Sequence, residues 1–354
     1  MKKVIVPILL MLISIGILTA CGKETSSNAN EGLKGELTVY TAVEEELLPN
    51  YLESFEKKYP NVELNIVRDS TGIITAKLLS EGKHTKADVV WGVQASNLLK
   101  LDQQNLLQSY SPEGIEEVPG IFKDKNQESP KWVGNVVTAS GITVNTVELE
   151  KMGLDVPRTY EDLTDPKYKG LIAMAHPASS GTGYLQVSTW LQMMGEEQGW
   201  KYMEDLHENV GMYTHSGSKP IQMAATGEFP ISLGLVYSGV QEKQKGAPVE
   251  VHLPKEGLGW DVEANAMINK EDTESDKLAK AFLDWAISDE AMKEYHQAYG
   301  LATKHENLPT AEGFPENFED LLYENHDLNV SAKNHTDIIN TWESKFSEKA
   351  EAKK

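Results

Sequence analysis

The sequence predicts an α/β protein that is folded into two lobes. Apolar runs with strand character alternate with helical runs along the chain, which is typical of βαβ units and a mainly parallel sheet. Two long extended segments, near 132–145 and 258–268, enclose a βα region of about 110 residues. Two such segments can join two lobes that close around a ligand by a hinge motion. The chain behind the N-terminal segment is long enough to form two cores.

Three strands and two helices are expected at the start of the folded chain. Runs that alternate in polarity or are rich in β-branched residues predict strands at 36–41, 62–67 and 87–91. Apolar residues at helical spacing predict helices at 44–59 and 72–79. Because parallel sheets bind ligands beyond the carboxyl ends of their strands, the residues that follow these strands are the first candidates for a site.

The rest of the chain continues the alternation after an irregular stretch at 105–130. The remaining expected strands are 170–175, 210–213, 229–237 and 249–252. The remaining expected helices are 183–194, 197–209, 219–226, 240–245, 277–287, 290–299 and a charged helix from about Thr336. We expect the C-terminal helices to return to the first lobe. The predicted lobes are therefore 35–137 with 266–354, and 138–265.

The N-terminus, residues 1–20, has the pattern of a signal peptide. Lys2 and Lys3 precede an almost wholly apolar run from Val4 to Ile17, which is too short for a comfortable transmembrane helix. Leu18-Thr19-Ala20-Cys21 follows and resembles the lipobox of bacterial lipoproteins, which are cleaved before the cysteine and lipidated on it.

Cys21 is the only cysteine, so the chain cannot form an intrachain disulfide. Residues 23–32 are rich in Ser, Asn and Glu, which predicts a flexible tether over 21–34 that begins with a lipidated Cys21. The expected location is therefore the extracellular face of a cell membrane, of Gram-positive type, with the protein held by its lipid.

The charge balance is strongly acidic. The chain has 33 Lys and Arg against 54 Asp and Glu, a net charge of −21. This excess of negative charge argues against nucleic acid and against a polybasic membrane contact. The only arginines are Arg68 and Arg158, so a bound anion would be held mainly by hydroxyls, backbone N–H groups and helix dipoles.

The segment 176–184, His-Pro-Ala-Ser-Ser-Gly-Thr-Gly-Tyr, is predicted to be a strand-to-helix turn that binds an anion. Its serines can cap the following helix, and its glycines leave backbone N–H groups accessible. A helix N-terminus combines unpaired N–H donors with a positive dipole end, which suits phosphate or phosphonate. We call this group the anion seat; it consists of Ser179, Ser180, Gly181, Thr182 and Gly183. An ordinary capped helix is the alternative interpretation.

Motifs for catalysis, nucleotides and metals are absent from the sequence. Gln186 stands where the dinucleotide pattern G-x-G-x-x-G requires glycine, and neither G-x-x-x-x-G-K-[ST] nor the G-x-S-x-G elbow occurs. The nine histidines show no zinc spacing such as H-E-x-x-H. We therefore expect no catalytic residue, no cofactor and no bound metal.

Four further segments are informative together: 18–21 (LTAC), 37–42 (LTVYTA), 55–62 (FEKKYPNV) and 87–92 (ADVVWG). They resemble segments of extracellular solute-binding lipoproteins of bacterial ABC importers. With the run Ser-Ser-Gly-Thr-Gly-Tyr at 179–184, the resemblance is closest to the ferric-iron and 2-aminoethylphosphonate branch, and it covers nearly all of the mature chain. It implies a two-lobed fold like that of type 2 periplasmic binding proteins, a monomeric binding protein, and permease and ATPase subunits as partners.

The expected ligand is a small anion or zwitterion held between the lobes. The candidate ligand-binding residues are Thr41, Glu44, Ser70, Thr71, the five residues of the anion seat, Tyr237, Trp260 and Asp261. Ser70 and Thr71 are at the start of a second helix, whose N–H groups can bind an anion. Tyr237 can donate its hydroxyl to the ligand, and the ring of Trp260 can form one side of the pocket. A ligand ammonium would need a carboxylate, for which Glu44, Asp69 and Asp261 remain open alternatives.

The resemblance leaves the ligand open between iron and phosphorus compounds. Ferric binders of this branch commonly use two adjacent tyrosines, whereas this chain has the single Tyr237 in Val236-Tyr237-Ser238. This departure favours a phosphonate or phosphate compound, with 2-aminoethylphosphonate as the best candidate. Ferric iron is the first alternative, and a surface adhesin on the same fold is a further one.

Overall fold

The computed structural model of the chain describes residues 32–126, 128–270 and 274–352. The predicted signal peptide, the lipidation of Cys21 and most of the predicted tether lie outside the described residues. Among the described residues, no helix combines the length and the apolar character that are needed to cross a membrane.

One half of the described molecule is built on a parallel arrangement of its first three strands. They are β1 (Gly35–Thr41), β2 (Val62–Arg68) and β3 (Val89–Gln94). β1 lies in the middle and pairs in parallel with both β2 and β3, so the carboxyl ends of all three strands point the same way. The sequence predicted these strands within a few residues, because each is a short β-branched run that is bounded by turn residues.

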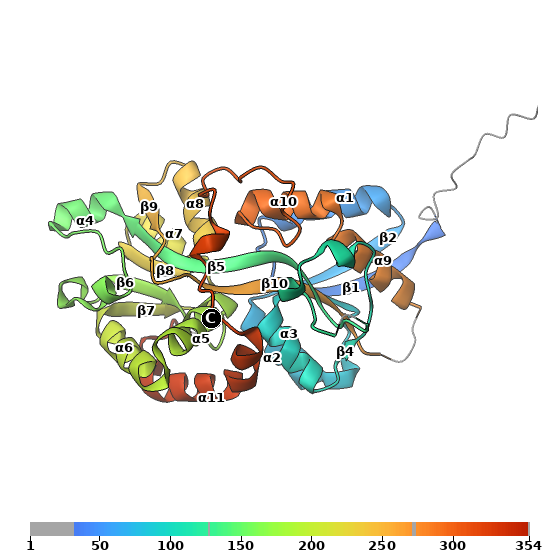
Figure 1. The fold of residues 1–354 in the computed structure, drawn as a ribbon, viewed down its shortest axis with the longest axis horizontal. Coiled ribbons are helices and arrows are strands. Elements are labelled where there is room, and N and C mark those ends of the chain that lie inside the picture. Colours follow the sequence, from blue (N-terminus) through green and yellow to red (C-terminus); the bar gives the residue numbers. More distant parts are fainter. Residues whose placement is uncertain (1–31, 127, 271–273, 353–354) are drawn as a thin grey trace, which may run out of the picture.

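Two long strands cross the middle of the molecule, as the sequence predicted. β5 (Val133–Asn145) and β10 (Gly259–Ile268) pair in an antiparallel manner, with a register shift between Glu263 and Ala264. β10 also pairs with β3, and β5 also pairs with β8. The described strands therefore form one hydrogen-bonded sheet in the order β2-β1-β3-β10-β5-β8-β6-β7, rather than two separate sheets, and β5 and β10 join its two halves (Figure 1).

The other half of the sheet contains β6 (Ile172–Ala175), β7 (Val210–Thr214) and β8 (Ile231–Leu235). β6 lies between β7 and β8 and is parallel to both. Two short strands, β4 (Leu107–Gln108) and β9 (Val249–His252), pair with β10 and β5 respectively. The carboxyl ends of β6 and β8 lead into the segments that the sequence marked as the anion seat and as the Tyr237 region.

Helices cover both faces of the sheet, with α1, α8 and α10 on one side and α2, α3, α5 and α11 on the other (Figure 1). The first six helices are α1 (Leu48–Lys58), α2 (Thr71–Glu81), α3 (Ala95–Gln103), α4 (Thr146–Met152), α5 (Gly181–Met194) and α6 (Glu196–Asn209). The others are α7 (Lys219–Thr226), α8 (Val236–Gln244), α9 (Asp276–Ala286), α10 (Asp289–Tyr299) and α11 (Leu328–Phe346).

The sequence missed some helical segments. It did not predict α3 and α4, it placed residues 236 and 237 in a strand although they begin α8, and it started α11 about eight residues late. α3 and α4 have only nine and seven residues, and isolated helices of that length are marginal, so tertiary packing supplies most of their stability.

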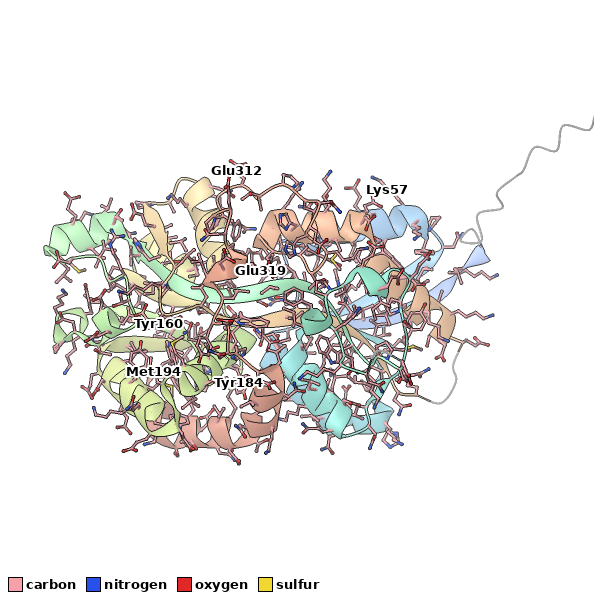
Figure 2. The ribbon with its side chains drawn as sticks, in the orientation of Figure 1. Lys57, Tyr160, Tyr184, Met194, Glu312 and Glu319 are labelled. Carbon is pink, nitrogen blue, oxygen red and sulfur yellow. The ribbon has the colours of Figure 1, made fainter. Side chains whose placement is uncertain are left out.

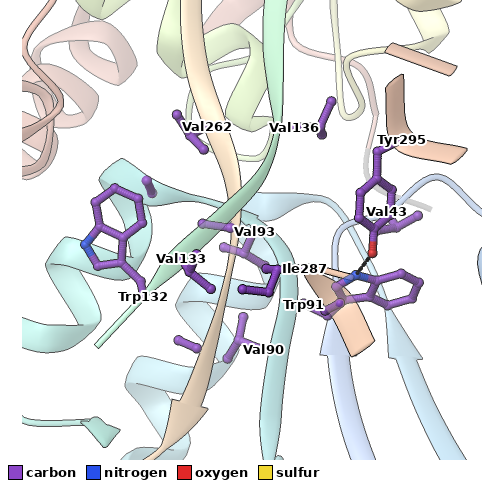
Figure 3. Close-up of a cluster of buried hydrophobic side chains, with 14 of the residues drawn as sticks. Val43, Val90, Trp91, Val93, Trp132, Val133, Val136, Val262, Ile287 and Tyr295 are labelled. Atoms are coloured by element: carbon purple, nitrogen blue, oxygen red, sulfur yellow. Dashed lines mark hydrogen bonds between the residues drawn. The ribbon is translucent and has the colours of Figure 1, made fainter. Parts of the chain in front are cut away.

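Two clusters of buried apolar side chains lie in the two halves. The larger cluster surrounds Trp91 of β3, whose ring packs 5.6 Å from Phe282 and 5.7 Å from Trp285 between ring centroids. The indole N–H of Trp91 donates to the hydroxyl of Tyr295 at 3.1 Å (Figure 3). The second cluster contains Tyr160 and Tyr184, which lie in the half that carries α5 and α6, away from Lys57 on α1 (Figure 2).

α11 packs against both halves of the molecule. Its residues Ile338, Trp342 and Phe346 belong to the second cluster, while the helix also packs on α3 of the first half. Ser331 accepts a hydrogen bond at its carbonyl from the hydroxyl of Tyr184 on α5. The prediction that placed all of 266–354 in the first lobe therefore does not describe the packing of α11, and the remaining lobe boundaries stay predictions.

The junction of α11 with the first half contains a buried neutral histidine. Lys100 of α3 donates to Nδ1 of His335 at 3.1 Å. Burial, with a smaller effect of the Lys100 charge, lowers the pKa of His335 to about 3. In the unfolded chain His335 has an ordinary pKa near 6.5. As the pH falls, the unfolded chain therefore binds a proton at His335 before the folded chain does.

We expect His335 to make folding acid-sensitive. Its contribution to stability is complete above about pH 6.5 and is lost as the pH falls toward its folded pKa; at pH 5 the loss is roughly 1–2 kcal/mol. Urea unfolding of the wild type and of His335→Gln at pH 7 and pH 5 measures it. The variant should lose less stability over this interval, and equal losses in both proteins would contradict the assignment.

Candidate ligand-binding site

The anion seat forms the first turn of α5, as the sequence predicted. β6 ends at Ala175, and the chain turns so that Ser180 becomes the N-cap of α5. The side-chain oxygen of Ser180 accepts from the N–H of Gly183 at 3.4 Å, and its carbonyl accepts from Tyr184 at 3.0 Å. A Cβ atom at Gly183 would collide with the carbonyl of Ala175. Glycine at this position therefore lets the helix start directly against the end of the strand.

The N-terminus of α2 lies against the anion seat from the other half of the molecule. The backbone N–H of Gly72 donates to the carbonyl of Ser179 at 3.1 Å, across more than a hundred residues of sequence. A Cβ atom at Gly72 would lie 2.5 Å from the carbonyl oxygen of Ala178 and 2.7 Å from that of Ser179. The two halves thus meet at this point in backbone-to-backbone contact that only glycine permits.

The side chain of Gln94 completes this junction. A Cβ atom at Gly181 would lie 2.6 Å from Cδ of Gln94 and 2.9 Å from Cβ of Thr71. Gln94 is 3% exposed, and its Oε1 atom has no hydrogen-bond partner among the described residues. A buried acceptor without a partner costs free energy, so a hydrogen-bond donor of a ligand could bind to this oxygen.

The electrostatics of the junction favour an anion. The N-termini of α2 and α5 approach each other from opposite halves, and both carry the positive end of a helix dipole. Two positive dipole ends repel each other unless a negative group lies between or beside them. The arrangement is thus suited to a phosphate or phosphonate group, which accepts several N–H and hydroxyl donors at once.

The remaining hydroxyls of the predicted site fall into two groups. Thr71 and Thr182 are buried at the junction, and Thr182 packs against Gly217. Ser70 is the N-cap of α2, and its side chain makes no capping hydrogen bond. Ser179 donates to the carbonyl of His215 at 3.1 Å. The structure therefore brings Ser70, Thr71 and the anion seat together, as predicted.

Three predicted residues are not brought to the anion seat. The hydroxyl of Thr41 donates to the carbonyl of Trp91 at 2.7 Å and accepts from the N–H of Val43 at 3.1 Å, so it is used within its own turn. Asp261 is buried at the N-terminus of α3, where it accepts from the N–H of Ser96 at 3.5 Å. Burial raises the pKa of Asp261 to about 7.

Trp260 faces away from the anion seat. Its indole N–H donates to the carbonyl of Tyr323 at 3.0 Å, and its ring lies 5.5 Å from the ring of His326 between centroids. It lines a separate cavity of about 390 Å³ together with Trp132 and Lys123. Neighbouring residues of a strand point to opposite faces, so Trp260 and Asp261 cannot serve one ligand site together.

A buried acidic cluster lies next to the anion seat, and the sequence found only part of it. Glu44 forms an ion pair with Arg68 at 2.6 Å, and Arg68 also donates to the carbonyl of Val43 at 3.0 Å. Glu263 of β10 is 8% exposed and faces Tyr299. Burial, followed by the nearby charge of Glu44, raises the pKa of Glu263 well above its ordinary value. Tyr237 lies beside this cluster, with its ring centroid 4.3 Å from that of Tyr299.

Sequence reasoning missed Gln94, Glu263 and Tyr299. Gln94 ends β3 and Glu263 lies within the buried strand β10, where an acidic residue in an apolar run was a signal that could have been used. Tyr299 ends α10, and nothing in its local sequence points to a site.

The described residues contain no group of three or more His, Cys, Asp or Glu side chains arranged to hold a metal ion. Tyrosines are not part of that criterion, so the pair of Tyr237 and Tyr299 is considered separately below.

Comparison with known proteins identifies the family. The model of the family described as bacterial extracellular solute-binding protein matches residues 84–318, more than half of the chain. An uncharacterized protein of Haemophilus influenzae is 33% identical over 278 residues, which cover 78% of this chain and 79% of that protein. The chain belongs to the family of bacterial extracellular solute-binding proteins. It is thus a solute-binding protein of an ABC importer and not an enzyme.

The curated relatives include transporter components. A probable ABC transporter periplasmic-binding protein of Sinorhizobium fredii, y4fP, is 22% identical over 67% of this chain and 66% of its own length. Iron uptake protein A1 of Synechocystis is 22% identical over 85% of this chain and 83% of its own length. A small-molecule ligand and the membrane components of an ABC transporter are therefore the partners that the family implies.

Solved structures share the fold. The periplasmic binding protein AfuA of Actinobacillus pleuropneumoniae, with exogenous fructose-6-phosphate bound, has a TM-score of 0.81 at 28% identity and covers 89% of this chain and 100% of its own. The periplasmic binding protein P5PA has a TM-score of 0.80 at 28% identity, over 88% of this chain and 100% of its own. Iron-bound HitA of Pseudomonas aeruginosa, at 18% identity, has a TM-score of 0.72 over 86% of this chain and 98% of its own. The predicted periplasmic-binding-protein fold is therefore confirmed.

Proposed function

We propose that this protein captures a small phosphonate or phosphate compound between its lobes for delivery to a membrane permease. 2-Aminoethylphosphonate is our best candidate. The observation that carries the proposal is the junction of the α2 and α5 N-termini, where the starts of two helices from opposite halves lie in contact. The bound fructose-6-phosphate of AfuA supports a phosphorus compound, since that protein has a similar fold.

Capture would couple binding to lobe closure. The phosphorus group would accept from the N–H groups and hydroxyls of the anion seat on one lobe, and from the start of α2 on the other. The contact of Gly72 with Ser179 then joins the lobes directly. A ligand that touches both lobes stabilises the closed form because it binds that form better than the open one. The permease can then distinguish loaded from empty protein by shape.

A thermal-shift screen of the purified protein tests the proposal. The panel contains 2-aminoethylphosphonate, ethylphosphonate, fructose-6-phosphate, inorganic phosphate and Fe³⁺. A specific ligand should raise the free energy of unfolding by ~3–4 kcal/mol when present at about 10²–10³ times its dissociation constant. The proposal is wrong if no phosphorus compound shifts the unfolding transition.

Ferric iron is a second candidate, because two tyrosines lie where the sequence showed one. Tyr237 and Tyr299 lie beside Glu44 and Glu263, and oxygen ligands of this kind suit a hard cation. Against iron, burial and the nearby carboxylates raise the pKa of both tyrosines well above the ordinary value, which keeps the phenols protonated. Arg68 also already neutralises Glu44.

We therefore expect Fe³⁺ to give no phenolate-to-iron charge-transfer colour with the purified protein. Absorbance titration with a soluble ferric chelate measures this, with the Tyr237→Phe protein as the control. Stoichiometric colour that disappears in Tyr237→Phe would favour iron and overturn the expectation.

We also propose that the protein is a lipoprotein anchored at Cys21 and exposed on the extracellular side of the membrane. The series of lysines, apolar run and Leu18-Thr19-Ala20-Cys21 is the basis. Cys21→Ser should release the protein from the membrane or leave the precursor uncleaved. Membrane fractionation and mass spectrometry of the mature N-terminus measure this. Normal cleavage with full membrane retention would contradict the proposal.

A further inference from the structure

The buried acidic cluster beside the anion seat contains two carboxyl groups, Glu44 and Glu263. The charge of Glu44 acts on Glu263, so the two side chains lie near each other, and Arg68 contacts Glu44. Arg68 lies at 2.6 Å from Glu44, whereas its effect on Glu263 is weaker than that of Glu44. Glu263 therefore lacks a close cationic partner among the described residues.

Burying such a carboxylate is costly. Glu263 is 8% exposed, and a buried carboxylate needs a positive partner or several hydrogen bonds, or it must take up a proton. The hydroxyl of Tyr299 supplies one interaction. The nearby Glu44 makes ionisation still harder, which explains why the pKa of Glu263 is raised well above its ordinary value. A cation that entered the cluster would relieve both effects.

A second polar group in the cluster is also left without a partner. Tyr237, at the start of α8, is 2% exposed, and its hydroxyl has no hydrogen-bond partner among the described residues. The charges of Glu44, Glu46 and Glu263 all act on this hydroxyl, and its ring packs on that of Tyr299, which interacts with Glu263. A buried hydroxyl that lies near two carboxyl groups and has no hydrogen-bond partner among the described residues is suited to a bound group.

The cluster adjoins the anion seat along two paths. Gln94, which meets Gly181 of the seat, lies directly opposite Glu263 in the antiparallel pairing of β3 with β10. Residues that are directly opposite in such a pair have side chains about 5 Å apart on the same face. On the other side, Ser218 interacts with Glu44, while its neighbour Gly217 packs on Thr182.

We propose that Glu263, with Glu44 and the hydroxyl of Tyr237, binds a primary ammonium group of the ligand. This inference rests on the proposed function and narrows it: the ligand is a small zwitterion that carries a phosphorus anion at one end and an amine at the other. Glu263 is then the residue that distinguishes amino compounds from amine-free phosphonates and from sugar phosphates.

The experiment compares two ligands that differ only in the amine. Calorimetric titration measures the affinity of the purified wild type for 2-aminoethylphosphonate and for ethylphosphonate. A charge-assisted hydrogen bond corresponds to roughly a ten- to hundredfold change in affinity, so the wild type should prefer the amine by that factor. In Glu263→Gln the preference should vanish, while the affinity for ethylphosphonate stays within about threefold.

Two further variants keep the result interpretable. Tyr237→Phe removes only the hydroxyl and should reduce the amine preference by a smaller factor. Glu63→Gln carries the same substitution at an exposed position of β2 and should bind as the wild type does. Unfolding without ligand shows that each variant is folded.

The outcomes separate this inference from the proposed function. If the wild type binds both phosphonates equally, the ammonium site is wrong and the anion seat stands. Equal weakening of both ligands in Glu263→Gln also overturns it. If the protein binds neither phosphonate but takes fructose-6-phosphate, the cluster binds hydroxyls instead. If Fe³⁺ binds to the wild type and not to Glu263→Gln, the cluster binds a metal ion and the ammonium site is wrong. If the protein fails to bind every phosphorus compound tested, both proposals are wrong.

Discussion

Gly72→Ala should abolish tight ligand binding while leaving the protein folded. The added methyl group would lie 2.5 Å from the carbonyl oxygen of Ala178 and 2.7 Å from that of Ser179. Real Cβ atoms do not approach a backbone this closely, so the lobes cannot reach the closed contact. If closure supplies the interactions of one helix N-terminus with the anion, affinity should fall by at least roughly a hundredfold.

The same substitution should not harm the isolated helix. Gly72 lies within α2 and is absent from the described glycines with positive φ, and alanine is a better helix former than glycine by about 1 kcal/mol. Each half should therefore still fold cooperatively in the variant, which separates blocked closure from misfolding. Calorimetric affinity and urea unfolding measure the two effects.

Ile73→Ala provides the matched control. Ile73 is the next residue of α2 and its side chain is exposed, so truncating it should change affinity little. Affinity of Gly72→Ala within twofold of the wild type would show that the contact between α2 and the anion seat is not part of the bound state, and the closure mechanism would have to be abandoned.

Trp91→Ala should have the largest effect on stability. Trp91 is fully buried and packs against Tyr51, Phe282 and Trp285, and its N–H bond to Tyr295 joins β3 to α10 (Figure 3). Removing a large aromatic side chain from a core costs about 3–5 kcal/mol because the transfer free energy is lost and a cavity remains. The free energy of unfolding from urea denaturation measures this loss.

Trp91→Phe separates packing from the hydrogen bond. It keeps an aromatic ring but leaves the hydroxyl of Tyr295 without this donor, which should cost about 1–3 kcal/mol. A loss below about 1 kcal/mol in Trp91→Ala would mean that the first core can collapse around the missing ring. It would contradict the view that this aromatic cluster fixes the position of β3, whose end carries Gln94.

Local patterns in the sequence determined most strands and the two crossing segments. β5 and β10 were predicted within about two residues, because thirteen and ten consecutive extended residues are a strong local signal. The anion seat was equally local: Ser180, Gly181 and Gly183 act within one turn of helix, through a cap and through the absence of side chains. Such features depend on neighbours in sequence, so the sequence is sufficient to predict them.

Only the tertiary structure decided what surrounds the anion seat. The meeting of Gly72 with Ser179 and of Gln94 with Gly181 joins residues about a hundred positions apart, and no local pattern encodes that distance. The same reason explains why two predicted site residues lie away from the anion seat. Thr41 and Asp261 carry groups that are suitable for ligand binding. In the structure the hydroxyl of Thr41 is hydrogen-bonded within a turn, and the carboxyl group of Asp261 is hydrogen-bonded at the N-terminus of α3.

The polar residues of β10 show the limit most clearly. The apolar pattern of the sequence indicated that β10 is buried, but it did not indicate which face of β10 contacts the other lobe. Trp260 was therefore placed in the site and Glu263 left out, whereas in the structure Trp260 lies against Tyr323 and Glu263 lies beside Glu44. A strand buried on both faces carries no polarity signal that distinguishes core from cleft. The partner that each face meets is set by packing between the lobes.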